Sequence, residues 1–168
     1  MKKIIIFLFL VTIVLLSGES KKNVVIPKES IRFRIIANSN SKNDQKLKWE
    51  INSKLIPVIN KITKNSNNIN ESRKNIKDNL NNIRQIVNKY TNNYSISFGQ
   101  NYFPKKEYND VIYNEGNYES LVITLGKGNG NNWWCVLFPP LCLIEAKKSE
   151  IDNITYSSYI NEVINKYF

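Results

Sequence analysis

The spacing of apolar residues changes near Asn92, and this change limits the folds that the chain can adopt. Before it, two stretches carry an apolar residue at every third or fourth position, which is the spacing of one buried helix face. They comprise Leu47, Ile51, Leu55, Val58 and Ile62, and then Ile76, Leu80, Ile83, Val87 and Tyr90. After it, Tyr94, Ile96 and Phe98 alternate with serines, which is the period of a half-buried strand. The two periods predict an α+β fold with two antiparallel helices packed on a mainly antiparallel β-sheet.

Short apolar runs bounded by glycine, asparagine or proline predict the other strands. They are residues 31–37, 102–103, 111–113, 118–125 and 133–138. Pro57 interrupts the first helical stripe, where it removes a backbone donor and crowds the preceding turn, so we expect a kink or a break there. The last apolar run, from Tyr156 to Tyr167, suits a short amphipathic helix, although its β-branched and aromatic residues also suit a strand.

The first twenty residues have the pattern of an export signal. They comprise Lys2 and Lys3, an uncharged run from Ile4 to Leu16, and the small residues Ser17 and Gly18. As a helix the apolar run would span only about 20 Å, against about 30 Å for the hydrocarbon core of a bilayer. We therefore expect residues 1–20 to be a signal peptide, with an uncleaved signal-anchor as the alternative.

The rest of the chain divides into a linker at residues 21–29, which is mainly polar, and one domain at residues 30–168. About 150 residues are enough for a single domain with a sizeable core. The formal charge of +10 would fall to about +8 once the two lysines of the signal are removed. A basic exported protein can contact an anionic membrane, anionic wall polymers or an acidic face of a protein, whereas export disfavours nucleic acid as a partner.

The chain contains no histidine. That removes the serine–histidine–aspartate and cysteine–histidine arrangements of nucleophilic catalysis, and it removes the commonest zinc ligand. We therefore predict a protein without catalytic residues, metal or cofactor. An exported cell-wall hydrolase that uses paired carboxylates is the alternative, although nothing in their spacing singles out a pair. Its candidate residues are Glu50, Glu107, Asp110, Glu115, Glu119 and Glu145.

The glycine-rich stretch Gly126–Gly130 could in principle bind a phosphate through its backbone amides. Its spacing matches neither a Walker loop nor a dinucleotide-binding loop, and we expect a strand on both sides of it. It is therefore predicted to be a turn.

The most unusual stretch runs from Trp133 to Cys142. Alternation places Trp133 and Trp134 on opposite faces of a strand, so one of them either packs on a second layer or lies exposed. An exposed tryptophan beside rigid prolines is typical of a protein-binding or membrane-interface site, while core packing is the plainer alternative. Export permits a disulfide between Cys135 and Cys142, and two buried thiols are the competing interpretation.

Several blocks of this sequence closely resemble the stage II sporulation protein R family of endospore-forming bacteria. They are Ile31–Ser41 with Asp44-Gln45, then Asn101–Lys106 and Gly116–Leu121, and finally Gly126-x-Gly128 running into Asn132–Cys142. The resemblance implies a signalling protein that is secreted from the forespore into the space between the forespore and mother-cell membranes. There it would activate, by contact, a membrane-embedded aspartic protease that processes the precursor of the mother-cell sigma-E factor.

The first block departs from the family at two positions, since Arg34 and Asn40 stand where we expect a histidine and an aspartate. Both changes raise the local positive charge, which suits a binding surface better than a catalytic one. The residues that we predict to contact the partner are Arg32, Asn38, Ser39, Trp133, Trp134, Pro139 and Pro140.

Overall fold

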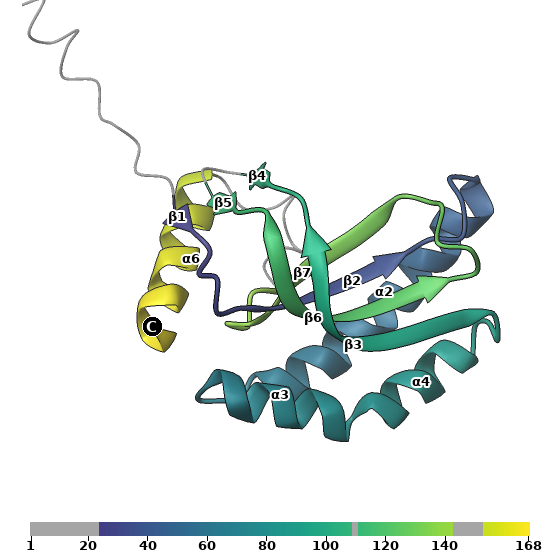
Figure 1. Ribbon diagram of the computed structural model, residues 1–168, viewed down its shortest axis with the longest axis horizontal. Helices are drawn as coiled ribbons and strands as arrows, with labels where there is room; N and C mark the ends of the chain where they lie inside the picture. The colour runs from purple at the N-terminus through teal and green to yellow at the C-terminus, as the bar shows by residue number, and fades with distance from the viewer. Residues whose placement is uncertain (1–23, 109–110, 143–152) are drawn as a thin grey trace, which may run out of the picture.

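The computed structural model describes residues 24–108, 111–142 and 153–168, and two β-sheets organise them (Figure 1). The strands are β1 (Val24–Val25), β2 (Ile31–Ile36), β3 (Tyr94–Phe103), β4 (Lys106–Tyr108), β5 (Val111–Tyr113), β6 (Gly116–Leu125) and β7 (Asn132–Phe138). The helices are α2 (Lys42–Thr63), α3 (Ile69–Asp78), α4 (Leu80–Asn88) and α6 (Asn153–Tyr167). The main sheet has the strand order β3-β6-β2-β7, and the small sheet has the order β1-β5-β4. The predicted export segment, residues 1–20, lies outside the described residues.

The main sheet is mixed in direction. Its inner strand β2 runs parallel to β6 and antiparallel to β7, and β3 runs antiparallel to β6. The parallel pair forms because the chain passes through α2, α3, α4 and β3 before β6 returns beside β2. The predicted α+β class is confirmed, while the sheets are mixed rather than purely antiparallel. The predicted strands at 94–98 and 102–103 are parts of one longer strand, β3, which Gly99 does not interrupt.

The first predicted helix is α2, and the residue before it is a serine, one of the residue types preferred at a helix N-terminus. Ser41 is its N-cap, and its hydroxyl oxygen accepts a hydrogen bond from the backbone N–H of Asp44, at 3.2 Å. The helix continues through Pro57, so the break considered at that residue does not occur. Pro57 and Ser53 are exposed, and the Ser53 carbonyl that lacks a donor from the proline can therefore bond to water.

The second predicted helix is divided into α3 and α4. Asn79 separates them, because its φ of −101° and ψ of 6° depart from the helical conformation. Its side-chain amide donates to the backbone oxygen of Asn75, at 2.8 Å, which stabilises the turn. Three helices rather than two therefore pack on one face of the main sheet (Figure 1). Their apolar faces meet Ile31, Phe33 and Ile35, the alternate residues of β2.

The last apolar run forms a helix, α6, which packs beside the small sheet (Figure 1). The hydroxyl oxygens of Tyr113 in β5 and Tyr156 in α6 are 2.8 Å apart in a hydrogen bond. Strand β1 pairs in parallel with β5, so two residues of the predicted linker take part in this sheet. Across the described ranges, no helix combines the length and the apolar composition needed to cross a membrane.

Candidate functional site

The predicted binding residues do not form one surface. They divide among the loop after β2 (Asn38 and Ser39), the main sheet (Arg32, Trp133 and Trp134) and the turn after β7 (Pro139 and Pro140). The fold brings Arg32 and Trp134 into one cluster and places Trp133 on the other side of the sheet.

Asn38 and Ser39 hold two loops together. The side-chain oxygen of Asn38 accepts a hydrogen bond from the backbone N–H of Lys127 at 2.9 Å, and its backbone oxygen accepts one from Asn129 at 3.0 Å. The Ser39 hydroxyl donates to the Asp44 carboxylate at 2.5 Å. Two hydrogen bonds hold the pKa of Asp44 below its usual value, and the one from Ser39 has a larger effect than the one from Asn38. The side-chain polar atoms of both residues are therefore engaged inside the molecule.

The glycine-rich stretch is a tight turn that fits against this loop. The backbone amides of Gly130 and Asn131 donate to the Ala37 backbone oxygen and the Asn40 side-chain oxygen, at 2.9 and 2.7 Å. A Cβ added at Gly130 would collide with the carbonyl of Ser39, so only glycine permits this close approach. Because these amides already have acceptors, the stretch does not present a phosphate-binding nest, which agrees with the prediction of a turn.

Arg32 lies in a cluster of aromatic rings on the face of the main sheet opposite the helices. Its guanidinium carbon is 3.4 Å from the ring centre of Tyr118, 5.0 Å from that of Phe103 and 5.2 Å from that of Trp134. Trp133 packs on the other side, with the helices, so the predicted opposite orientation of the two tryptophans is confirmed. Arg32 is 0% exposed. A partner could not reach it, which corrects its place among the binding candidates.

Arg34 occupies the next position on the same face of β2. Its guanidinium carbon is 3.8 Å from the ring centre of Phe103, and an Nη donates to the backbone oxygen of Tyr102 at 2.8 Å. Burial lowers the pKa of Arg34. Arg34, one of the two departures from the family pattern, therefore packs against the aromatic cluster instead of projecting into solvent.

Trp133 and the exposed Trp49 of α2 form an aromatic pair at the edge of the main sheet. Their ring centres are 6.3 Å apart, and the ring of Phe33 supports Trp133 from the core at 6.0 Å. The Lys48 amine lies 5.0 Å from the Trp49 ring and donates to the backbone oxygen of Asn131 at 3.1 Å. Burial lowers the pKa of Lys48. We call Trp49, Trp133 and Lys48, together with the edge strand β7, the tryptophan edge.

Sequence reasoning did not single out Trp49, although a signal was present. Trp49 stands between Leu47 and Ile51, outside the apolar stripe of its helix. A large apolar residue on the polar side of an amphipathic helix indicates exposure, and 51% of Trp49 is exposed. That position, read together with the unusual Trp133, would have identified the pair only if the two segments were known to be neighbours.

Cys135 and Cys142 are joined by a disulfide, with their Cα atoms 5.1 Å apart. The bond closes the turn that begins at Pro139 and Pro140, directly after β7. Pro139 is buried, whereas Pro140 is half-buried and lines a groove beside α6. Of the two prolines, only Pro140 is therefore placed to contact a partner.

The carboxylates proposed for a hydrolase do not assemble into a site in the described residues. Glu119 binds Arg73, with Nε–oxygen distances of 2.7 and 2.9 Å, and this contact raises the pKa of Arg73. Glu115 accepts a hydrogen bond from the Tyr102 hydroxyl at 3.3 Å. The other candidates are Glu50 and Glu107, which are exposed, and Asp110 and Glu145, which lie outside the described residues. Within those ranges, no group of three or more histidine, cysteine or acidic residues could hold a metal ion.

Comparison with known proteins identifies the family. The profile of stage II sporulation protein R matches residues 27–148. The chain is also similar to stage II sporulation protein R of Bacillus subtilis, with 40% identity over 133 residues. That match covers 76% of this chain and 59% of the relative, so the chain spans less than two thirds of the relative's length. No solved structure matches the fold. The chain belongs to the stage II sporulation protein R family.

Proposed function

We propose that this protein is an exported sporulation signal that activates a membrane-embedded aspartic protease by contact. Membership of the family supports a role in sporulation. In this proposal the forespore secretes the protein into the space between the forespore and mother-cell membranes. The activated protease then processes the precursor of the mother-cell sigma-E factor. The protein supplies binding energy for the active form of the protease and no catalytic group of its own.

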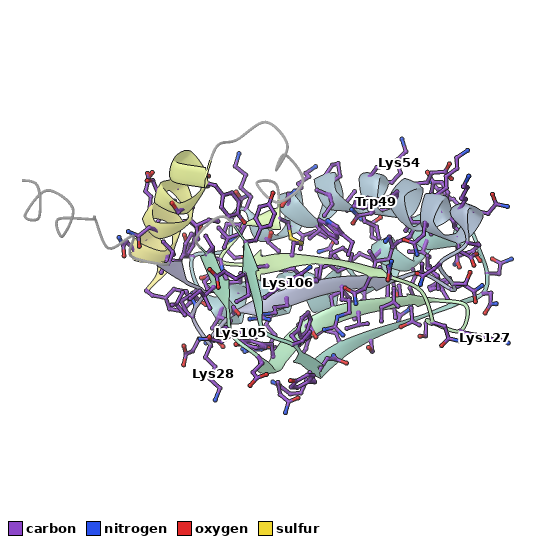
Figure 2. The ribbon with its side chains drawn as sticks, turned by 90° about the horizontal axis from the view of Figure 1, so that it is seen from above. Lys28, Trp49, Lys54, Lys105, Lys106 and Lys127 are labelled. Atoms are coloured by element: carbon purple, nitrogen blue, oxygen red, sulfur yellow. A yellow bond between two sulfur atoms is a disulfide. The ribbon has the colours of Figure 1, made fainter. Side chains whose placement is uncertain are left out.

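The tryptophan edge is the observation that carries this proposal. Tryptophan is enriched among the residues that dominate protein–protein binding, and here Trp49 is half exposed on the helix side of the sheet (Figure 2). Trp133 lies on β7, an edge strand whose main chain can pair with a strand of a partner. The Leu141 N–H donates to the Val136 oxygen at 3.1 Å, so the turn after β7 folds back on the far end of that strand. The half of β7 that carries Trp133 is therefore the better place for a partner to dock.

Alanine substitutions at the tryptophan edge test the proposal. We expect Trp49→Ala and Trp133→Ala each to reduce processing of the sigma-E precursor by about tenfold or more, since a binding hot spot contributes about 2 kcal/mol or more. Tyr102→Ala is the matched control, because Tyr102 is 56% exposed but lies on β3. Immunoblots measure how much of the precursor is processed with each variant. Secretion assays and circular dichroism check that each variant is exported and folded.

Trp49→Ala decides the test if Trp133→Ala fails to fold, because the exposed Trp49 supports less of the core. Normal processing with a secreted and folded Trp49→Ala variant would remove the tryptophan edge from the proposal. Cross-linking of the wild-type protein to the protease tests the partner itself. Its failure under conditions that support processing would contradict activation by contact.

Peripheral contact with an anionic membrane or wall polymer is a subsidiary part of the proposal. Lys28 follows β1 and Lys106 opens β4, so both lie at the small sheet, and Lys105 precedes Lys106. Lys28 and Lys105 lie in the same region of Figure 2, while the Lys106 amine lies 5.5 Å from the ring centre of Trp134. We expect the protein to pellet with anionic vesicles in low salt and to be released at high salt, because salt screens exposed charges. Equal pelleting with neutral vesicles would contradict this contact.

A further inference from the structure

The outer edge of β7 carries main-chain groups that the main sheet does not use. Strand β7 is an edge strand, so only the side that faces β2 is paired. In an antiparallel ladder, one residue directs both its N–H and its C=O toward the neighbouring strand, and the next residue directs both away. The residues of β7 that face away from β2 therefore decide what can bind at this edge.

A hydrogen bond outside the ladder indicates which residues these are. The oxygen of Val136 accepts from the N–H of Leu141 at 3.1 Å, and Leu141 lies in the turn after β7 rather than on β2. Val136 therefore faces away from β2. By the alternation of the ladder, Trp134 and Asn132 face outward in the same way.

The opposite strand agrees with this assignment. Ala37 directly follows β2, and its oxygen accepts from the N–H of Gly130 at 2.9 Å, on the side of β7. Ile35 is two residues earlier, so its main-chain groups also face β7, where Trp133 is its partner in the register. The bonded pairs of the ladder thus use Trp133 and leave the residues on either side of it facing outward.

Only two of the outward residues have an open main chain. Within the ranges that the structure describes, the N–H and C=O groups of Asn132 and Trp134 have no hydrogen-bond partner outside the ladder. Asn132 is exposed and Trp134 is half-buried. Val136 is closed by Leu141, in a turn that the disulfide ties to β7. The open edge is therefore short.

The open groups select a main chain as the ligand. Donors and acceptors that alternate along a strand edge are matched by another extended backbone, which supplies acceptors and donors at the same spacing. A phosphate or a carboxylate supplies acceptors alone, and it would leave the carbonyl oxygens of Asn132 and Trp134 without donors. The edge therefore fits an extended protein segment rather than a free anion.

The length of the open edge does not suit a second copy of this chain. Symmetric pairing of two β7 strands through both open residues would place Asn132 of one copy opposite Trp134 of the other. The same ladder would bring Gly130 of the second copy opposite Val136, where Leu141 already lies. A segment of three or four extended residues spans about 10–14 Å, so it can end before that point.

We propose that the edge from Asn132 to Trp134 binds a short extended segment of the membrane-embedded protease by strand addition. The main chain of the segment pairs with the two outward residues. Its residue on the helix side packs an apolar side chain on Trp133 and on the exposed Trp49. The inference rests on the proposed function, since it specifies how that partner binds.

Proline at position 132 tests the main-chain contact. Asn132→Pro removes the outward N–H and places a ring where an oxygen of the partner would lie. The fold should accept it, because proline is tolerated at the first residue of a strand and where the N–H faces solvent. Asn132→Ala is the matched variant, since it truncates the same side chain and keeps the N–H. We expect the full chain with N132P to bind the detergent-solubilised protease at least about tenfold more weakly than the full chain with N132A.

Amide hydrogen exchange tests the edge without any variant. In the free full chain, the N–H groups of Asn132 and Trp134 should exchange at least about tenfold faster than that of Trp133, which is bonded to β2. Addition of the protease should slow exchange at Asn132 and Trp134. Equal protection of all three in the free chain would overturn the inference, even if N132P failed to fold.

Three further results would also overturn the inference. Equal binding of the protease by N132P and N132A would remove the main-chain contact and leave the proposed function standing. A wild-type dimer that N132P dissociates would assign the edge to a second copy. Failure of the wild type itself to bind the protease would overturn the proposed function as well, and it is distinct because it does not involve the variants.

Discussion

The guanidinium carbon of Arg32 lies 3.4 Å from the ring centre of Tyr118, where Arg32 has no exposure to solvent. One Nη of the arginine also donates to the backbone oxygen of Asn114, at 3.3 Å. A cation over the face of an aromatic ring is attracted by the ring's negative face, more strongly when both are removed from water. The planar guanidinium can stack in this way while it keeps its hydrogen bonds, which an ammonium group cannot do equally well.

We predict that Arg32→Lys lowers the free energy of unfolding by about 1–3 kcal/mol, because the stacked and bonded plane is lost while a buried charge remains. Urea unfolding followed by circular dichroism measures the change. Arg84→Lys is the control, since Arg84 is exposed and bonds to Asn81 on its own helix. Equal stability of the Arg32 variant and the wild type would contradict a structural role for the guanidinium.

We predict that Gly130→Ala destabilises the protein by about 1–3 kcal/mol, because a Cβ there would meet the Ser39 carbonyl and the Cβ of Ala37. Gly99→Ala is a matched control, since a Cβ at Gly99 has no neighbour within 4 Å. Its effect should stay within about 0.5 kcal/mol. Thermal unfolding measures the stability of both variants. A similar loss of stability in the two would contradict the close approach of the loops.

We predict that replacing Cys135 and Cys142 together by alanine lowers the free energy of unfolding by about 2–3 kcal/mol. The two residues are 7 apart in sequence, and closing a loop of this size raises the free energy of the unfolded chain by about that amount. Adding dithiothreitol should destabilise the wild type and leave the variant unchanged. If the reductant affected both proteins equally, the loss could not be assigned to this bond.

We predict that Asp44 contributes a pH-dependent part of the stability. The pKa of its carboxyl is lowered in the folded protein by hydrogen bonds from Ser39 and Asn38, so the contribution is complete above the ordinary aspartate pKa of 3.8. It is lost as the pH falls through the lower folded pKa, because the protonated carboxyl accepts these bonds less well. The difference in melting temperature between wild type and Asp44→Asn should therefore shrink in strong acid. A constant difference from about pH 7 to pH 2 would contradict the assignment.

Local periodicity was enough to predict the parts of the fold that depend on neighbouring residues. The alternation of β7 places Trp133 and Trp134 on opposite faces, and the contacts with Phe33 and Phe103 confirm it. The start of α2 is equally local, since the Ser41 hydroxyl satisfies a free backbone amide in the first turn of the same helix. Neither inference needs to know what lies across the sheet.

The features that sequence did not predict depend on residues far apart in the chain. Arg32 pairs in register with Ser120, and the side chain is buried because rings from β3, β6 and β7 close over it. An arginine is almost never fully buried, so its residue type predicts exposure. The groove beside α6, which Asn60 also lines, similarly depends on where α6 packs. Because the chain is rich in asparagine, the sequence around Asn60 does not indicate that this residue lines a groove.

The pairing of β1 with β5 determines how far the domain could move from a membrane. Strand β1 begins at Val24, four residues after the end of the predicted export segment, and four extended residues span at most about 14 Å. An uncleaved segment would therefore keep the small sheet, and α6 which contacts β1, at the height of the lipid headgroups. The groove beside α6 would then meet only partners that also lie at that bilayer, whereas cleavage would let the domain diffuse and present every face.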